Sequence, residues 1–159
     1  MTHALPAVLI AALILPATSH AQSKPDFSGT WTMDPTRSES AMQTEPIGPV
    51  THVISQMPNE LRIETRRGGR TTSAIYKLDG SESKLPDGTA TTHWDGTTLV
   101  TEMVRDIRGA TVTTKESRRL SADGNEMLID TVLVVQHGYS LRGTPNYGAG
   151  KDVFTRVRP

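Results

Sequence analysis

The stretch TATTHWDGTTLVTEMVRD, residues 89–106, carries the pattern that decides the fold class. Threonine and valine recur along it, and β-branched side chains suit the pleated, half-buried surface of a sheet. Asp95-Gly96 divides the stretch in two, and an Asp-Gly pair favours a tight hairpin because it tolerates positive φ. The stretch therefore predicts an antiparallel hairpin with strands at residues 89–95 and 97–106.

Turn signals of the same kind recur at short intervals on both sides of this hairpin. They are Pro58-Asn59, Gly68-Gly69, Asp79-Gly80, Asp87-Gly88 and Asp123-Gly124. The further segments predicted as strands are residues 28–34, 50–57, 60–67, 70–78, 110–120, 126–136 and 151–157. Short strands between regularly spaced turns indicate a sandwich or a barrel. We expect an all-β domain, an up-and-down antiparallel β-barrel of about eight strands.

Two stretches are predicted as loops. Residues 35–49 contain three prolines, and residues 138–150 contain four glycines and two tyrosines. The second stretch has two interpretations: a flap at the rim of the barrel, or an ordinary long hairpin loop.

The N-terminal segment has the pattern of a secretory signal. An apolar run at residues 7–15 is followed by Pro16 and by Ser19-His20-Ala21, an A-x-A-like cleavage site. Nine helical residues reach only about 14 Å, against roughly 30 Å for a bilayer core, so a stable membrane span is not expected. We predict a signal peptide at residues 1–21, a barrel domain at residues 22–159, and a periplasmic or secreted location. The segment lacks the usual Lys or Arg near its start, and the alternative is a buried N-terminal helix or strand.

The composition excludes several classes of function. The chain has no cysteine, so thiolate chemistry, disulfides and a cysteine-linked lipid are impossible. Its 17 basic and 17 acidic residues balance, which argues against nucleic-acid binding through a basic surface. His52, His93 and His137 lie far apart without metal-binding spacing, and no nucleophile elbow or phosphate-binding loop occurs. We predict no catalytic residues, no metal and no cofactor.

Alternation along the strands assigns side chains to the inside of the barrel. Leu61 and Ile63 alternate with charged residues and should therefore face inward. The residues predicted to line a ligand cavity are Leu61, Ile63, Tyr76, Trp94, Met103 and Arg118. For Trp94, a plug in the core is the alternative to a surface on which a ligand stacks.

One predicted strand places charges on an inward face. If Val112 and Leu120 point inward, so do Glu116 and Arg118, and buried charges are costly unless they are paired or hydrated. Two interpretations follow: a polar patch in a cavity, where Arg118 holds an anionic head group, or an ion pair at an open, wet end of the barrel.

Several sequence strings resemble known families. Gly29-x-Trp31 at the start of the first strand and Arg156 in the last resemble the calycins, the superfamily of lipocalins and fatty-acid-binding proteins. The resemblance implies that Trp31 lies across one end of the barrel with Arg156 packed over its ring, so that Gly29, Trp31 and Arg156 close the barrel. DFSGTW (26–31), WDGTTLV (94–100) and RLSADGNEMLI, which ends at Ile129, are similar to small secreted bacterial lipocalin-like proteins. That group implies the fold and export but no activity.

Three functions are compatible with these features. The first is an exported carrier of a small hydrophobic or amphipathic ligand. The second is a protein-binding module, an inhibitor or envelope-assembly factor, that uses residues 138–150 or the outer face of residues 128–135. The segment 128–135 is apolar on both faces for half its length, which indicates that its outer face is covered. The alternative to a partner protein there is coverage by the chain's own residues 35–49. The third is an enzyme, which the sequence favours least. A cavity above about 300 Å³ would favour the carrier.

Overall fold

The computed structural model describes residues 23–39, 49–137 and 145–158, which form ten antiparallel strands in one sheet. The strands are β1 (Gly29–Met33), β2 (Val50–Met57), β3 (Glu60–Arg67), β4 (Arg70–Lys77), β5 (Glu82–Leu85), β6 (Gly88–Asp95), β7 (Thr98–Ile107), β8 (Ala110–Leu120), β9 (Glu126–His137) and β10 (Asn146–Arg156). Among these residues, no helix is long and apolar enough to cross a membrane. The chain has the predicted all-β fold.

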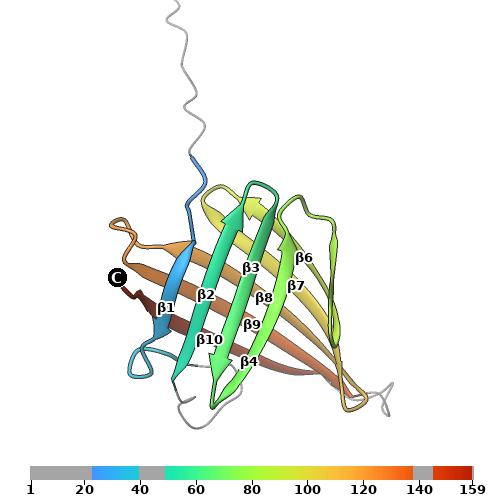
Figure 1. Cartoon of the computed structure of the whole chain (residues 1–159). Helices are drawn as coiled ribbons and strands as arrows, with labels where there is room; N and C mark the ends of the chain where they lie inside the picture. Colours follow the sequence, from blue (N-terminus) through green and yellow to red (C-terminus); the bar gives the residue numbers. More distant parts are fainter. Residues whose placement is uncertain (1–22, 40–48, 138–144, 159) are drawn as a thin grey trace, which may run out of the picture.

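The sheet curls into a nearly closed barrel because the first strand pairs with the last. The strand order is β4-β3-β2-β1-β10-β9-β8-β7-β6-β5, and Trp31 lies opposite Arg156 in the β1–β10 register. In Figure 1, strands β1–β4 form a front wall that crosses the rear wall of β7–β10. The edge strands β4 and β5 are joined near one end, where the Lys77 amide donates to Ser83 Oγ at 2.8 Å.

The strand prediction needs two corrections. The sequence predicts about eight strands and does not predict β5, a four-residue strand whose composition, Glu-Ser-Lys-Leu, lacks β-branched residues. The last strand begins at Asn146 rather than at Lys151. Gly148 and Gly150 therefore belong to a strand, and the predicted loop at residues 138–150 is too long at its C-terminal end. Residues 138–144 lie outside the described part of the chain, as do 40–48 in the other predicted loop.

The hairpin predicted within residues 89–106 forms from β6 and β7. Thr92 on β6 pairs with Thr101 on β7, and Gly96 in the connecting turn has a φ of 59°. Positive φ is accessible to glycine at no steric cost, so the Asp-Gly pair fixes where the chain reverses.

Apolar side chains fill part of the barrel. Phe27, Trp31, Leu61, Leu99 and Met127 are completely buried, and we call these five residues the packed region. The Trp31 indole Nε1 donates to the Phe27 carbonyl at 2.8 Å, which satisfies the buried ring nitrogen and fixes the segment that enters β1.

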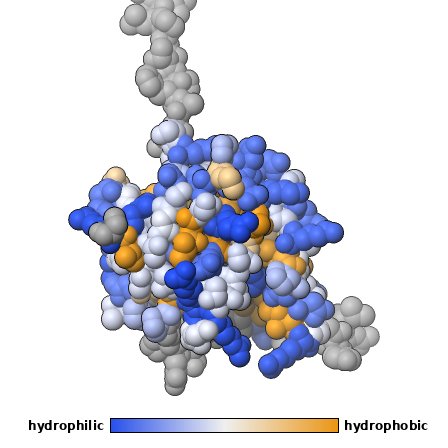
Figure 2. Space-filling view, in the orientation of Figure 1, coloured by the Kyte–Doolittle hydropathy of each residue, from blue (hydrophilic) through white to orange (hydrophobic). Residues whose placement is uncertain are grey.

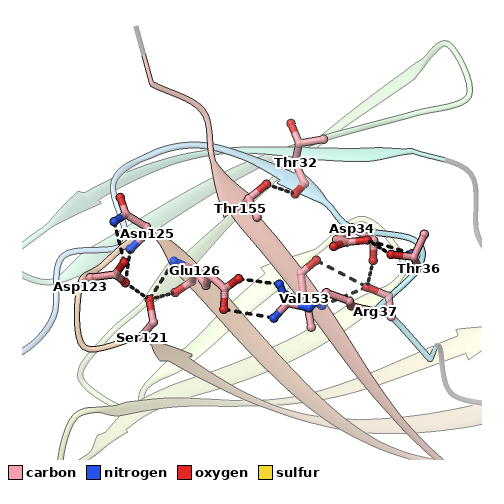
Figure 3. A network of polar contacts seen from close by, with 11 residues as sticks. Thr32, Asp34, Thr36, Arg37, Ser121, Asp123, Asn125, Glu126, Val153 and Thr155 are labelled. Carbon is pink, nitrogen blue, oxygen red and sulfur yellow. Dashed lines mark hydrogen bonds and ion pairs between the residues drawn. The ribbon is translucent and has the colours of Figure 1, made fainter.

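Polar contacts hold the outside of the seam between β1 and the β8–β9 turn. Arg37 forms two hydrogen bonds with the Glu126 carboxylate, at 2.6 and 3.2 Å (Figure 3). In the adjacent turn, Asp123 accepts a hydrogen bond from the Ser121 hydroxyl at 2.6 Å. This bond and the hydrogen bonds from Asn125 lower the pKa of Asp123 to about 2.

The face seen in Figure 2 mixes hydrophilic and hydrophobic residues.

Candidate functional site

A cavity of about 580 Å³ occupies the part of the barrel that the packed region does not fill. Its apolar lining consists of Ile63, Ala74, Leu85, Pro86, Met103 and Leu133. Its polar lining consists of His52, Thr65, Thr72, Ser73, Tyr76, Asp87, Arg105, Thr114, Glu116, Arg118, Thr131 and Asp152. The cavity therefore offers an apolar surface together with many hydroxyl groups and a small number of charges.

The structure separates the six predicted lining residues. Ile63, Tyr76, Met103 and Arg118 line the cavity. Leu61 is completely buried in the packed region and does not line the cavity. Alternation along β3 places Leu61 and Ile63 on the same face, but it does not tell how far along the barrel axis the cavity extends.

Trp94 also lies away from the large cavity. Its ring is half-buried and stacks on Phe27 with 6.0 Å between the ring centroids, and the Lys24 ammonium lies 5.6 Å from its centroid. A separate recess of about 260 Å³ is lined by Lys24, Asp26, Gln56, Met57, Pro58, Leu78 and Trp94. Trp94 therefore packs partly against the core and lines this recess, and it does not reach the larger cavity.

The inward charged pair on β8 lies in the wall of the cavity. Arg118 is 4% exposed and forms an ion pair with Glu116 through Nη2. Its Nη1 donates to Thr101 Oγ1 at 3.4 Å, and Thr101 shares a hydrogen bond of 3.1 Å with Thr92. Both side chains line the cavity, and Arg118 is nearly buried in its wall.

A second ion pair lies at the same cavity. Arg105 Nε lies 3.5 Å from Asp87 Oδ1, and both residues contribute to the lining. The sequence analysis missed Arg105, although alternation with Met103 on β7 places both side chains on the inward face. It also missed Asp87, because that residue was assigned only to a turn.

His52 is a half-buried histidine at the cavity wall. Desolvation lowers the pKa of its imidazole from 6.5 to about 3, and the positive charge of Arg118 acts in the same direction. The ring stacks on Phe154 with 4.5 Å between the centroids. His52 is therefore neutral at physiological pH, and it packs as an aromatic ring with polar atoms.

Three buried polar atoms have no hydrogen-bond partner among the described residues: His52 Nδ1, Arg105 Nε and Arg118 Nε. All three belong to residues that line the cavity. Buried polar groups in proteins are nearly always paired, and Arg105 Nε has Asp87 Oδ1 as an ion-pair partner 3.5 Å away. Within the described ranges, no group of His, Asp and Glu side chains is arranged to hold a metal ion.

Gly29, Trp31 and Arg156 meet at the seam of the barrel, apart from the cavity lining. The Arg156 guanidinium lies 4.1 Å from the centroid of the Trp31 ring. It also donates to the carbonyls of Ser28 at 2.5 Å and Gly124 at 3.0 Å. Gly29 has a φ of 133°, and a Cβ there would lie 2.9 Å from Arg156 Nη1, so a side chain at this position would disturb the contact.

Comparison with solved structures identifies the type of barrel. Fatty-acid-binding protein 1 of Echinococcus granulosus is 14% identical, with a TM-score of 0.54 over 83% of this chain and 98% of that chain. The fluorescent protein UnaG is 16% identical, with a TM-score of 0.51 over 82% of this chain and 97% of that chain. An asparagine-to-alanine variant of UnaG gives 17% identity and a TM-score of 0.52 over 84% and 97%.

The fold is that of the calycin barrels. At these identities the likeness concerns the fold alone, and this chain has ten strands where the sequence predicted about eight. No protein-family model matches the sequence, and no curated protein matches it either.

Proposed function

We propose that residues 22–159 form an exported binding protein that holds one small, partly apolar ligand inside the barrel. The cavity of about 580 Å³ carries this proposal. Ligand sites commonly measure about 300–1,000 Å³ and combine apolar walls with a few placed polar groups. A barrel with a side-chain-filled interior, as expected for a module that binds only proteins, would have no such space. The similar fold of a fatty-acid-binding protein is compatible with the same use of the interior.

The proposal can be tested by filling the cavity from one position. Thr114 lines the cavity, whereas its neighbour Thr113 is exposed on the outer face of β8. Thr114→Trp should abolish binding of the uncharged, environment-sensitive dye Nile red to the purified protein, and Thr113→Trp should leave it unchanged. Circular dichroism and the urea midpoint of each variant establish that both are folded.

Two results would contradict the proposal. The first is a wild-type protein that does not bind the dye. The second is a folded Thr114→Trp variant that still binds the dye while Thr113→Trp loses it. The second result would favour the outer face, where Val104 and Tyr147 are 47% and 70% exposed, and with it the protein-binding alternative.

Export is supported by the apolar run at residues 7–15 and the small residues before the proposed cleavage site at Ala21. N-terminal sequencing of protein isolated from its own host should give Gln22 as the first residue. Recovery of the protein in the cytoplasm with residues 1–21 intact would contradict export, and it would leave the binding proposal standing.

A further inference from the structure

Arg118 is a cation in the interior of a ligand-binding barrel. It lies on β8 between Leu99 of β7 and Ile129 of β9, and both of these neighbours are nearly or completely buried. A guanidinium in such surroundings needs a negative partner, because an unpaired buried charge is strongly destabilising. Such a partner can come either from the ligand or from the chain.

In this chain the carboxylate of Glu116 is the negative partner. Glu116 stands two residues before Arg118 on the same strand, so the period of two places both side chains on the inner face. The Glu116 carboxylate accepts a hydrogen bond from Arg118 Nη2, and its own side chain is 20% exposed. The Glu116 carboxylate therefore neutralises Arg118 before any ligand arrives.

The rest of the described lining gives no spare positive charge. Arg105 is paired with Asp87, as Arg118 is with Glu116. Within these two pairs neither a carboxylate nor an ammonium group of a ligand would find an unpaired counter-charge, and His52 is neutral at pH 7. An anionic ligand would meet the Glu116 carboxylate beside the cation it seeks, and like charges in a site of low dielectric disfavour each other.

The remaining polar wall is made of neutral groups. Thr65, Thr72, Ser73, Thr114 and Thr131 each present a hydroxyl, which can donate or accept a hydrogen bond. Such a wall suits a ligand whose head group is an amide, an alcohol or an ester. The apolar side chains, among them Ile63, Met103 and Leu133, suit its hydrocarbon part.

We infer that Glu116 determines the ligand class: the cavity takes uncharged amphipathic molecules and disfavours free carboxylic acids. This inference deepens the proposed function and rests on it. Removing the Glu116 charge while keeping its shape frees Arg118 to pair with a carboxylate from the ligand. The variant Glu116→Gln should therefore change the preference between two ligands that differ only in head group.

The experiment measures displacement of Nile red by decanamide, decanoic acid and decylamine at neutral pH. Wild-type protein should bind decanamide at least about tenfold more tightly than either charged ligand, because a charged head group finds no unpaired counter-charge in the two ion pairs. A tenfold ratio corresponds to about 1.4 kcal/mol of binding free energy. Glu116→Gln should bind decanoic acid at least about tenfold more tightly than wild type does, with decanamide changed by less than about threefold.

Two controls separate the cavity charge from general effects. Glu102→Gln makes the same change on the outer face of β7, where Glu102 lies 3.5 Å from Lys115, and it should leave all three affinities unchanged. The double variant Glu116→Gln with Arg118→Gln removes both charges, so decanoic acid should stay weak and decanamide should bind as in wild type. Should Glu116→Gln alone not fold, the ratio of the decanamide and decanoic acid affinities of wild-type protein still tests the inference.

The outcomes are distinguishable. If wild-type protein binds decanoic acid or decylamine as tightly as decanamide, the inference is wrong while the proposed function stands. The inference is equally wrong if decanoic acid gains nothing in folded Glu116→Gln, or gains as much in the double variant. If wild-type protein binds neither Nile red nor any of the three ligands, the proposed function itself fails.

Discussion

The packed region and the cavity are built from the same strands by the same alternation of side chains, yet one is filled and the other is not. β3 contributes Leu61 to the packed region and Ile63, two residues on, to the cavity wall. β7 is divided in the same way, with Leu99 in the packed region and Met103, four residues on, in the cavity wall. The comparison shows that alternation decides which side chains point inward, whereas their size and polarity decide whether the interior is full.

Removing Trp31 should have the largest effect on the packed region. Its ring is completely buried and carries the Arg156 guanidinium at 4.1 Å. Trp31→Ala should lower the free energy of unfolding by about 3–5 kcal/mol, measured by urea titration. Trp94→Ala, at a half-buried ring beside the separate recess, should cost clearly less. Equal losses at the two tryptophans would contradict the distinction between the regions.

Truncating β3 at two adjacent inward positions compares the regions directly. Leu61→Ala opens a new void in a filled space and should cost about 2–5 kcal/mol in the free energy of unfolding. Ile63→Ala only enlarges an existing cavity, so its cost should be smaller by about 1 kcal/mol or more. Chemical denaturation of both variants tests this order, which would be wrong if Ile63→Ala were the more damaging change.

Acid should weaken the cavity side through His52. The pKa of His52 is lowered to about 3 in the folded protein and returns to about 6.5 on unfolding, because burial disfavours the imidazolium. Between these values the unfolded state binds more protons, so stability falls as pH falls, by up to about 1.4 kcal/mol per pH unit. His52→Gln should lose this part of the pH dependence between pH 6.5 and 3. If the free energy of unfolding fell equally with pH in wild type and variant over that range, His52 would not be the source of the pH dependence.

The smallest expected effect lies at Thr92, a buried residue that shares a hydrogen bond of 3.1 Å with Thr101. Thr92→Val keeps the side-chain volume and removes that hydrogen bond, so the free energy of unfolding should fall by about 0.5–1.5 kcal/mol. Thr91→Val, at the neighbouring outward position on β6, is the matched control and should change thermal stability little. A loss as large as that of Leu61→Ala would contradict this estimate. It would mean that Thr92 also stabilises the hydrogen bond between Arg118 and Thr101, beyond its own hydrogen bond to Thr101.

The sequence predicted the fold well where side-chain pattern and turn chemistry act together. Asp95-Gly96 marked its hairpin, and alternation placed Ile63 and Arg118 on the inner face. The prediction failed at β5, where none of the four residues is β-branched or aromatic, and at the start of β10, where two glycines suggested a loop.

The cavity was harder to predict, for a physical reason. Local pattern fixes the face of a strand, but the empty volume depends on which distant side chains come together at one level of the barrel. Leu61 was assigned to the cavity because it shares a face with Ile63, and Asp87 was missed because a turn residue has no assigned face. The Glu116–Arg118 pair was visible only because both of its members lie on one strand.

The contact between the two ends of the chain has a consequence for biosynthesis. Arg156 donates to the carbonyl of Ser28, 128 positions earlier, so the seam joins residues that are far apart along the polypeptide. A nascent chain cannot form this contact until β10 has left the ribosome, and closing such a long loop is slow. Until then β1 has no β10 to pair with, and the barrel stays open along this edge.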